Sequence, residues 1–475
     1  MARHGVHVRC HVSVRIALEE GIHVAHSPSL ERVEYRLGTI LTTLVESHPD
    51  RPARPRVVIV GAGFGGLAAA RALRHVPVDV TLIDRHNYHL FQPLLYQVAS
   101  GLLDPSEIAH PIRTVVRHAR NVDVLLAEVT GIDVAPKRVL TTGAAVPFDF
   151  LVLATGSATN FFGIPHLEEH ATGLKDLPET LALRARVLRA FEQATRCSDP
   201  AERRRLLTFA VAGAGPTGVE FAGALAELFR HVLPKDFPHL DFSEASVVLV
   251  EGTDRVLGTF APRLGQSAAR RLERKGVRLL LGRSVKDVDG SALILDDGER
   301  IDASMIVWTA GVTAAPVADL LGSPASRQGR VRVTPQLHLP ERDDLFVIGD
   351  AAEMEDRGEV LPMLAPVAIQ EGKHVAGVIR ARLRGASEPP FRYFDKGTMA
   401  TVGRGAAVAQ IGPIRINGLI GWLIWVFVHL MYLVGFRSRV IVFFTWAWNY
   451  FFYDRPVRLI VGTSSDEPRI RREDV

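Results

Sequence analysis

A glycine-rich turn between two apolar strands is the feature that most constrains how this chain folds. Residues 57–60 form a short β-branched run, typical of a buried parallel strand, and a helical segment follows the turn. Gly61, Gly63 and Gly66 have the G-x-G-x-x-G spacing, which allows a tight turn, close approach of a pyrophosphate and close helix packing. The next strand ends in Asp84, whose carboxylate can accept from a ribose hydroxyl. Together these features predict a dinucleotide site with the pyrophosphate at the helix N-terminus; the alternative is a tight turn without a ligand.

The same pattern recurs further along the chain. Residues 207–212 resemble a second buried strand, and Gly213, Gly215 and Gly218 repeat the glycine spacing before another helical segment. The strand after that helix ends in Glu251, the counterpart of the first acidic residue. The repeat predicts a second dinucleotide site.

Each copy closes with a further strand and a small-residue turn. Thr155 and Gly156 end the closing strand of the first copy, and Thr309 and Gly311 end that of the second. From the first motif glycine to the closing threonine, the separation is 94 residues in one copy and 96 in the other. Such matched spacing predicts two copies of one architecture, each with a nucleotide bound between the glycine turn and the closing strand.

The acids that end the second strand of each copy indicate which nicotinamide nucleotide binds. Asp84 and Glu251 suit a free ribose hydroxyl, whereas either carboxylate would repel a 2′-phosphate. Arg255 follows closely behind Glu251. We expect NADH rather than NADPH.

Three further segments carry polar residues that suit a ligand. Residues 85–101 mix His, Asn, Tyr and Gln with apolar residues, which favours a loop and short helix lining a pocket for a flat aromatic ligand, or a loop packed on the sheet. Asp350 follows a buried strand, where it can hold a polyol hydroxyl. Residues 363–384 predict a helix carrying Gln370, either at a pocket edge or exposed. Residues 122–146 resemble a hairpin, and 231–244 a surface loop.

Composition excludes some functions. The net charge of +4 is too small to indicate nucleic-acid binding. The two cysteines, Cys10 and Cys197, lie far apart, which excludes a vicinal dithiol and points to a reducing compartment. No Cys or His cluster has metal-ligand spacing, so we expect no metal site. Residues 1–54 have no apolar core and no A-x-A site, so a secretory signal peptide is not expected.

The C-terminal region is strongly apolar. Residues 418–436 contain no formal charge and would span about 28 Å as a helix, nearly the thickness of a bilayer's hydrocarbon core. After Arg437 and Arg439, residues 440–453 are rich in aromatic side chains but too few to span. Four of the five tryptophans lie in this region, as expected at a membrane interface. We favour a monotopic or re-entrant anchor, with a true span or a buried homodimer interface as alternatives.

The order of these motifs resembles that of the two-dinucleotide-binding-domain flavoproteins, and specifically the type II NADH:quinone oxidoreductases, which do not pump protons. The resemblance extends over residues 56–460. Its motifs are VIVGAGFGGL, DRHNYHLFQPLLYQVASG, LVLATGS, VAGAGPTGVEFAG, VLVEGTDRVL, IVWTAGV, LFVIGDAA, APVAIQEGKHVA and FDKGTMATVGR. The second of these is the most specific to the family, whereas the glycine triplets alone fit many reductases.

The resemblance implies a role for each site. The first copy, with Asp350, would bind FAD and the nested second copy NADH, from which electrons pass through the flavin to a membrane quinone. The helix with Gln370 would line the quinone end of the flavin, where the family's Ala-Gln pair is replaced by residues 365–366, Ala-Pro. Glu220 would aid proton handling and Lys396 would lie near the quinone; the alternatives are a helix-start charge and a surface lysine.

The expected fold is therefore α/β, with two Rossmann-like domains and a C-terminal membrane-associated helical segment. The expected segments are a weakly ordered extension (1–54), the FAD-binding domain in two parts (55–170 and 316–412), the NAD-binding domain (171–315) and the membrane anchor (413–475). The resemblance implies a location at the cell membrane, peripheral on the cytoplasmic side.

Three other functions compete with this interpretation. A sulfide:quinone reductase needs cysteines near the flavin, whereas Cys197 precedes the second glycine triplet and Cys10 lies outside the fold. A soluble NAD(P)H-dependent reductase of a protein carrier would not need the aromatic tail. A non-catalytic or redox-sensing module would keep both glycine triplets.

Overall fold

The structure is a computed structural model that describes residues 54–460 except 317–319, 323–324 and 327. The extension expected over residues 1–54 lies outside the described residues apart from Arg54. All the helices and strands described below belong to one unit, Pro55–Val475.

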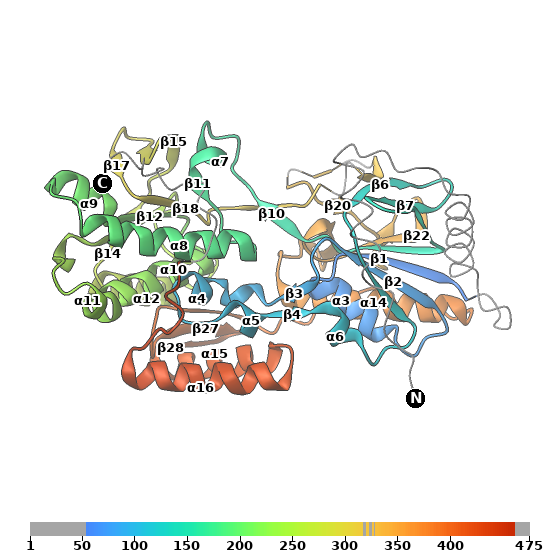
Figure 1. Ribbon diagram of the computed structural model, residues 1–475. Coiled ribbons are helices and arrows are strands. Elements are labelled where there is room, and N and C mark those ends of the chain that lie inside the picture. Colours follow the sequence, from blue (N-terminus) through green and yellow to red (C-terminus); the bar gives the residue numbers. More distant parts are fainter. Residues whose placement is uncertain (1–53, 317–319, 323–324, 327, 461–475) are drawn as a thin grey trace, which may run out of the picture. The chain divides into compact units, whose positions relative to one another are not determined.

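A six-stranded sheet contains the first glycine motif (Figure 1). In spatial order its strands are β21 (His338–Leu339), β22 (Arg342–Val347), β9 (Phe150–Leu153), β1 (Arg56–Val60), β2 (Asp79–Asp84) and β5 (Val122–Leu126). All neighbours are parallel except β21 and β22. Val60 pairs with both Ile83 and Leu153, so the carboxyl ends of these strands reach one edge of the sheet together.

Two helices cover the first strand. Helix α3 (Phe64–Ala72) follows β1 and begins inside the glycine motif, between Gly63 and Gly66. Helix α14 (Ala365–Leu383) begins at Ala365 rather than 363 and packs across α3. The two backbones approach so closely that a Cβ on Gly372 would lie 2.2 Å from the Gly65 carbonyl oxygen. Glycine is required there because a larger residue would separate the helices.

A five-stranded, fully parallel sheet contains the second glycine motif. In spatial order its strands are β11 (Ala171–Thr172), β18 (Met305–Trp308), β12 (Thr208–Ala212), β13 (Ser246–Glu251) and β14 (Val277–Leu281). Helix α10 (Pro216–Glu227) follows β12, and α12 (Pro262–Arg274) precedes β14. The order β18-β12-β13-β14 matches β9-β1-β2-β5 of the first sheet, which confirms an α/β fold with two Rossmann-like parallel sheets.

Short elements connect these layers. Before α8 (Leu177–Ala194) they are β3 (Tyr88–Leu90), a 3₁₀ turn (Gln92–Leu94), α4 (Leu95–Ala99), α5 (Pro105–Ile108), β4 (Ala109–Pro111), α6 (Ile112–Val116), β6 (Val129–Asp133), β7 (Arg138–Thr141), β8 (Val146–Pro147), β10 (Ser157–Thr159) and α7 (Leu167–His170). After α8 they are α9 (Pro200–Leu206), β15 (Val285–Asp289), β16 (Ala292–Leu295), β17 (Arg300–Asp302), β19 (Val312–Ala314), β20 (Val331–Arg332), a 3₁₀ turn (Gly349–Ala351), β23 (Ala352–Glu353), β24 (Glu355–Asp356) and β25 (Glu359–Val360).

Two expectations about connecting segments are wrong in part. The first five residues of the supposed 122–146 hairpin are β5 of the main sheet, because Val122 lies in its core and Val124 and Leu125 pack against that core. Within this segment only β6, β7 and β8 form antiparallel pairs. Residues 231–244 are a surface loop only in part: a π-helical turn (Leu228–Val232) and α11 (Leu233–Asp236) continue α10, and a short loop then leads to a 3₁₀ turn (Phe242–Glu244). Val232 and Leu233 extend its buried face.

The C-terminal region combines a small sheet with two helices. Strands β26 (Thr398–Thr401), β27 (Ala407–Ile411) and β28 (Ile414–Asn417) are antiparallel and lead into α15 (Gly418–Tyr432) and α16 (Phe436–Phe452). A single helix over residues 418–436 is therefore wrong: α15 ends at Tyr432, and Gly435, with φ +85°, turns the chain into α16. Of the helices described, none combines the length and the apolar character needed to cross a membrane.

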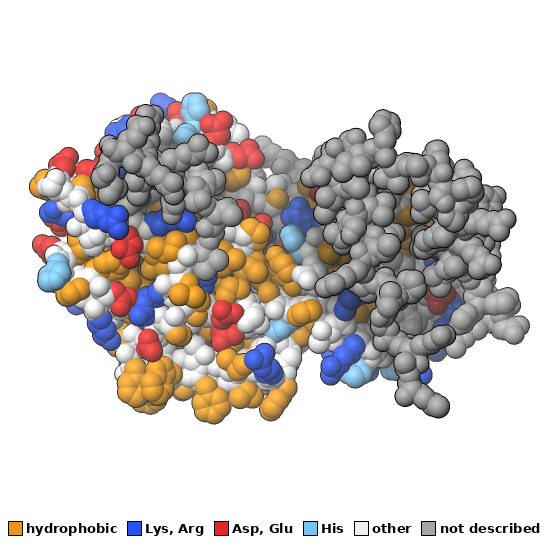
Figure 2. Space-filling model, in the orientation of Figure 1, with side chains coloured by type: hydrophobic (Ala, Val, Ile, Leu, Met, Phe, Trp, Pro, Cys, Tyr) orange, Lys and Arg blue, Asp and Glu red, His pale blue; other side chains and the backbone are white. Residues whose placement is uncertain are grey.

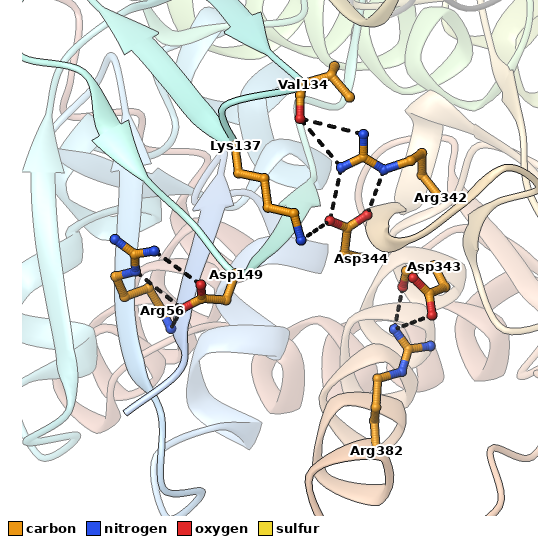
Figure 3. A network of polar contacts seen from close by, with 8 residues as sticks. All are labelled: Arg56, Val134, Lys137, Asp149, Arg342, Asp343, Asp344 and Arg382. Carbon is orange, nitrogen blue, oxygen red and sulfur yellow. Dashed lines mark hydrogen bonds and ion pairs between the residues drawn. The ribbon is translucent and has the colours of Figure 1, made fainter. Parts of the chain in front are cut away.

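Ion pairs hold the opposite edge of the first sheet (Figure 3). Arg56, at the start of β1, binds Asp149 just before β9, while Asp344 in β22 accepts from both Arg342 and Lys137. Burial opposes ionisation of Asp344, but these cations outweigh it and lower its pKa to about 2. The network lies at the strands' amino-terminal ends, so it supports the fold and leaves the glycine edge free.

Candidate active site

The first glycine turn forms a cradle at the carboxyl edge of β1. Gly61 has φ +99°, a conformation that favours glycine, and its N–H donates to Ile83 O over 2.7 Å. A Cβ on Gly66 would lie 1.9 Å from the Gly61 oxygen, so only glycine lets α3 begin this close to the strand. A Cβ on Gly63 would meet no atom within 4 Å, which leaves open space at the helix N-terminus for a ligand's pyrophosphate.

Asp84 lies beside this cradle and is held by backbone groups. The Ala62 N–H donates to Oδ2 and the His86 N–H to Oδ1, both over 2.7 Å. Each carboxylate oxygen can accept a further hydrogen bond. Asp84 is thus fixed in position and still able to accept from a ribose hydroxyl.

The far side of the cradle carries a polar group that fits a ligand. Thr155 Oγ1 is buried and has no hydrogen-bond partner among the described residues. Gly156, with φ +71°, again faces open space. Asp350 contacts the residue after Gly156: its carboxylate accepts a hydrogen bond from the Ser157 hydroxyl. The same carboxylate lies 3.8 Å from Lys175 Nζ. A nucleotide bound beside Gly156 could supply the hydrogen bond that the Thr155 hydroxyl lacks.

The second cradle repeats this geometry. Gly213 has φ +97°, a Cβ on Gly218 would lie 1.9 Å from the Gly213 oxygen, and Gly215 faces open space. Glu251 takes the place of Asp84: Oε2 accepts from the Ala214 N–H over 2.6 Å and Oε1 from the backbone N–H two residues on, over 2.9 Å. This acid too keeps free acceptor capacity.

The closing side of the second cradle differs from the first. The Thr309 hydroxyl lies 2.9 Å from the carbonyl oxygens of residues 212 and 213, so it is already satisfied. Gly311 faces the ring of Phe162, 2.5 Å from where a Cβ would be. Phe162 is 60% exposed and has φ +54°. Arg255 turns into its own loop and donates to Gly258 O over 2.9 Å.

Gln370 and Lys396 are brought together by one loop. The Gln370 amide accepts from the Phe394 N–H and donates to the Phe394 carbonyl, each over 3.0 Å. Two residues later, Lys396 Nζ donates to Tyr432 OH in α15 over 2.8 Å. Pro366 occupies the first turn of α14, where a missing N–H is tolerated, and its carbonyl accepts from Gln370.

Glu220 lies apart from that loop, on α10, and faces β26. It is buried, and its Oε1 accepts from the Thr401 N–H over 3.1 Å. Burial raises its pKa to about 8, although hydrogen bonding by the Thr401 N–H and by the Trp425 side chain opposes the shift. A carboxyl with this pKa can hold and release a proton near neutral pH.

Sequence reasoning missed two residues of the site. Glu371, next to Gln370, points into the fold and accepts from the Gly349 N–H over 2.5 Å, and burial raises its pKa to about 8. The second missed residue is Phe162, whose ring lies over Gly311 in the second cradle. Glu371 could be noticed in the sequence only as the acidic neighbour of Gln370, because its burial depends on distant packing; no local pattern indicated a role for Phe162. Within the described ranges, no three His, Cys, Asp or Glu side chains gather as a metal site would require.

Comparisons with known proteins agree with this geometry. Residues 55–372 match the pyridine nucleotide-disulphide oxidoreductase family. Two type II NADH:quinone oxidoreductases of Mycobacterium tuberculosis, Ndh and NdhA, are 46% and 41% identical to this chain, and each alignment covers 83% of this chain and 88% or 87% of the relative. The structure of NDH2 from Plasmodium falciparum in complex with NADH has the same fold, with a TM-score of 0.79, 19% identity and coverage of 86% of this chain and 100% of that one. The chain therefore belongs to the pyridine nucleotide-disulphide oxidoreductase family and, within it, to the type II NADH:quinone oxidoreductases.

Proposed function

We propose that FAD occupies the first cradle and NADH the second, and that electrons from NADH pass through FAD to a membrane quinone. As a type II NADH:quinone oxidoreductase, the chain transfers electrons from NADH to a quinone; the proposal assigns residues to this activity. When bound, FAD supplies the two-electron centre between the two substrates.

One observation supports a nucleotide in each cradle. The Ala62 N–H and Asp84 in one cradle, and the Ala214 N–H and Glu251 in the other, form the same acid-to-turn hydrogen bond. Each acid can then accept from a ribose hydroxyl while the helix N-terminus faces the pyrophosphate. The unpartnered Thr155 hydroxyl and Asp350 give the first cradle additional polar groups for FAD.

The quinone end is assigned to the residues around the 394–396 loop. Gln370 holds the backbone of Phe394, and Lys396 links the same loop to Tyr432. Phe394 is 70% exposed, so the loop presents an apolar ring beside polar groups, as a quinone's tail and headgroup require. Glu220 is assigned to proton handling.

We assign the C-terminal helices to peripheral membrane association. Figure 2 shows apolar side chains gathered along the edge where Figure 1 places α15 and α16. The large exposed side chains there are Leu419, Ile420, Leu423, Phe427, Met431, Phe436, Val440, Phe443, Phe444, Trp448, Phe451 and Phe452. An apolar patch of this kind suits insertion into the headgroup region of a membrane. We propose that the enzyme lies on the cytoplasmic side, where NADH is its substrate.

Anaerobic half-reactions test the redox proposal. NADH added to the purified flavoprotein should bleach the visible flavin absorbance, and a menaquinone or ubiquinone analogue should restore it. Sulfide in place of NADH should leave the flavin oxidised. Failure of NADH to reduce the flavin, or of both quinones to reoxidise it, would contradict the proposal and favour a protein acceptor or a non-catalytic module.

Surface substitutions test membrane association better than removal of residues 413–475. Strand β28 pairs with β27 and Trp425 is fully buried, so truncation would open the core. The combined variant Phe427→Ser, Phe444→Ser and Phe451→Ser should stop sedimenting with lipid vesicles while NADH oxidation by ferricyanide survives. Leu126, on β5, is also more than half exposed, so Leu126→Ser is the control and should still bind vesicles.

A further inference from the structure

The carbonyl oxygen in the middle of each glycine turn accepts a hydrogen bond from outside the turn. In the second cradle the donor belongs to the backbone: the Leu257 N–H donates to Ala214 O over 2.8 Å. In the first cradle the corresponding oxygen, Ala62 O, lies 2.9 Å from Nδ1 of His89. Both turns also donate one hydrogen bond to a strand carbonyl and one to an acid. The two cradles therefore share three contacts, and in one of these the first cradle uses a side chain where the second uses the backbone.

The direction of the His89 hydrogen bond follows from the acceptor. A carbonyl oxygen only accepts, so His89 Nδ1 carries a hydrogen and donates it to Ala62 O. Burial lowers the pKa of His89, which favours the neutral ring, and a neutral imidazole has a single N–H. The one N–H of His89 is therefore committed to the glycine turn.

The surroundings of His89 hold its ring in this position. The residue is buried in β3, where it pairs with His110 of β4. The ring of Phe64, the first residue of α3, lies perpendicular to the His89 ring, with the ring centroids 5.3 Å apart. A buried ring packed against the start of the helix has little room to rotate, so its N–H stays directed at the turn.

The Ala62 carbonyl and the Gly63 N–H belong to one peptide group. In a trans peptide the C=O and N–H bonds point in opposite directions, so the Gly63 N–H points away from His89. Gly63 is the N-cap of α3, whose N–H the helix itself leaves unpaired, and a Cβ on Gly63 would meet no atom within 4 Å. This N–H therefore faces the open space that suits a phosphate oxygen.

The hydrogen bond from His89 affects this donor in two ways. It fixes the plane of the Ala62–Gly63 peptide, so the Gly63 N–H keeps one direction before a ligand binds. It also draws electron density toward the carbonyl oxygen, which makes the N–H of the same peptide a stronger donor. Both effects favour an anion at the helix start, and neither requires His89 to contact that anion.

We propose that His89 is a positioning residue for the FAD pyrophosphate and acts through the Ala62–Gly63 peptide that its N–H holds. The inference rests on the proposed function, which assigns FAD to the first cradle. The NADH cradle is independent of His89, because the corresponding carbonyl there accepts from the backbone N–H of Leu257, which no change of side chain removes.

Three substitutions at His89 separate the hydrogen bond from the shape of the side chain. Asparagine carries its amide nitrogen as many bonds from the backbone as Nδ1, glutamine carries it one bond further, and leucine has no donor. We expect the purified holoenzyme to release FAD about 3- to 10-fold faster in His89→Leu and His89→Gln, as the loss of one hydrogen bond predicts. His89→Asn should release FAD at close to the wild-type rate. The fluorescence of free FAD after dilution measures the rate.

Phosphorus NMR of the bound FAD reports on the pyrophosphate directly. His89→Asn should keep the wild-type phosphate chemical shifts, whereas His89→Leu and His89→Gln should change them. A side chain that only filled space would not make asparagine and glutamine differ in this way. The KM for NADH, measured with FAD in excess, should be unchanged in all three variants.

The outcomes separate this inference from the proposed function. If the purified wild-type protein binds no FAD, the proposed function is wrong. If wild type binds FAD and all three variants release it at the wild-type rate, His89 does not position the pyrophosphate. Equal acceleration in all three, or equal phosphate shifts in the asparagine and glutamine variants, would mean that packing matters and the hydrogen bond does not. If His89→Leu fails to fold, the comparison of asparagine with glutamine still decides.

Discussion

The two nucleotide cradles are built alike and closed differently. In both, a glycine with φ near +100° follows a central strand, and an acid at the end of the neighbouring strand accepts from the turn's N–H over 2.6–2.7 Å. Beyond the four matching strands, the first sheet continues with the six-residue parallel strand β22, which leads to Asp350, and α14 packs on α3. The second sheet ends in the two-residue strand β11.

This difference fits the two ligands we propose. The first cradle combines residues 56–156 with the later segment 342–383, and its Thr155 hydroxyl has no hydrogen-bond partner among the described residues, as suits a cofactor that stays bound. In the second, Thr309 is already satisfied, and the exposed ring of Phe162 lies over Gly311. A side chain that a ligand can displace suits a substrate that must enter and leave every turnover.

The largest expected effect comes from matched glycine substitutions, Gly66→Ala and Gly218→Ala. In both, the new Cβ would lie 1.9 Å from a carbonyl oxygen, which costs about 3 kcal/mol or roughly 150-fold. We expect Gly66→Ala to lose FAD and all activity. Gly218→Ala should keep its flavin and raise the KM for NADH. The ratio of flavin absorbance to protein measures this directly.

Gly377→Ala is the control, because a Cβ at this position of α14 would meet no atom within 4 Å. It should keep both flavin and activity. If Gly218→Ala also loses its flavin, the two cradles do not act separately and the comparison fails.

The second prediction concerns substitution of the acid in each cradle, Glu251 and Asp84. Glu251→Ala should raise the KM for NADH by roughly 10- to 150-fold, since a lost charge-assisted hydrogen bond costs about 1.5–3 kcal/mol. Glu251→Arg should narrow the preference over NADPH. Asp84→Ala should instead weaken FAD retention without changing that preference. Steady-state kinetics with both nucleotides check this, and an unchanged NADH/NADPH ratio in both Glu251 variants would reject the assignment.

What the sequence predicted well is local. In each copy, a strand, a glycine turn and a terminal acid lie within a few dozen residues. The spacing of these residues along the chain was therefore enough to predict two Rossmann-like domains. The break at Gly435 was missed because residues 418–436 are apolar on both sides of it, and hydropathy does not register a backbone turn. Glu371 and Phe162 depend on packing between distant segments: Glu371 faces Gly349 only because α14 lies against the first sheet. The site roles remain predictions.

The third prediction separates the cradles from the quinone end. Gln370→Ala removes the amide that bridges the N–H and carbonyl of Phe394, which should loosen the loop carrying Lys396. We expect flavin reoxidation by quinone to slow roughly 5- to 30-fold, for about 1–2 kcal/mol, while reduction by NADH is unchanged. Stopped-flow half-reactions separate the two. Lys373→Ala, exposed on the same helix, is the control, and equal losses in both half-reactions would reject the role.

The smallest expected effect concerns stability and compares two buried carboxyls: Glu371 on α14, beside the first sheet, and Glu220 on α10, beside the second. Burial raises the pKa of both to about 8 in the folded protein, so both hold protons that the unfolded chain has already released. Their contribution to stability is fully present below about pH 4.5 and is lost as the pH rises to about 8. Asp344 has the opposite sign: with a pKa of about 2, its contribution is present above about pH 4 and lost on acidification.

Melting temperatures across this range test the signs. Relative to wild type, Glu371→Gln and Glu220→Gln should gain several degrees between pH 5 and pH 8, at about 2–4 °C per kcal/mol, because the amide cannot ionise. Asp344→Asn should lose most at neutral pH and least near pH 2. The exposed Glu359→Gln should run parallel to wild type throughout. If only Glu371→Gln gains melting temperature relative to wild type between pH 5 and pH 8, the two buried carboxyls are not equivalent. Glu220 would then ionise in the folded protein without loss of stability, and its assignment as the residue that holds a proton near neutral pH would lose its basis.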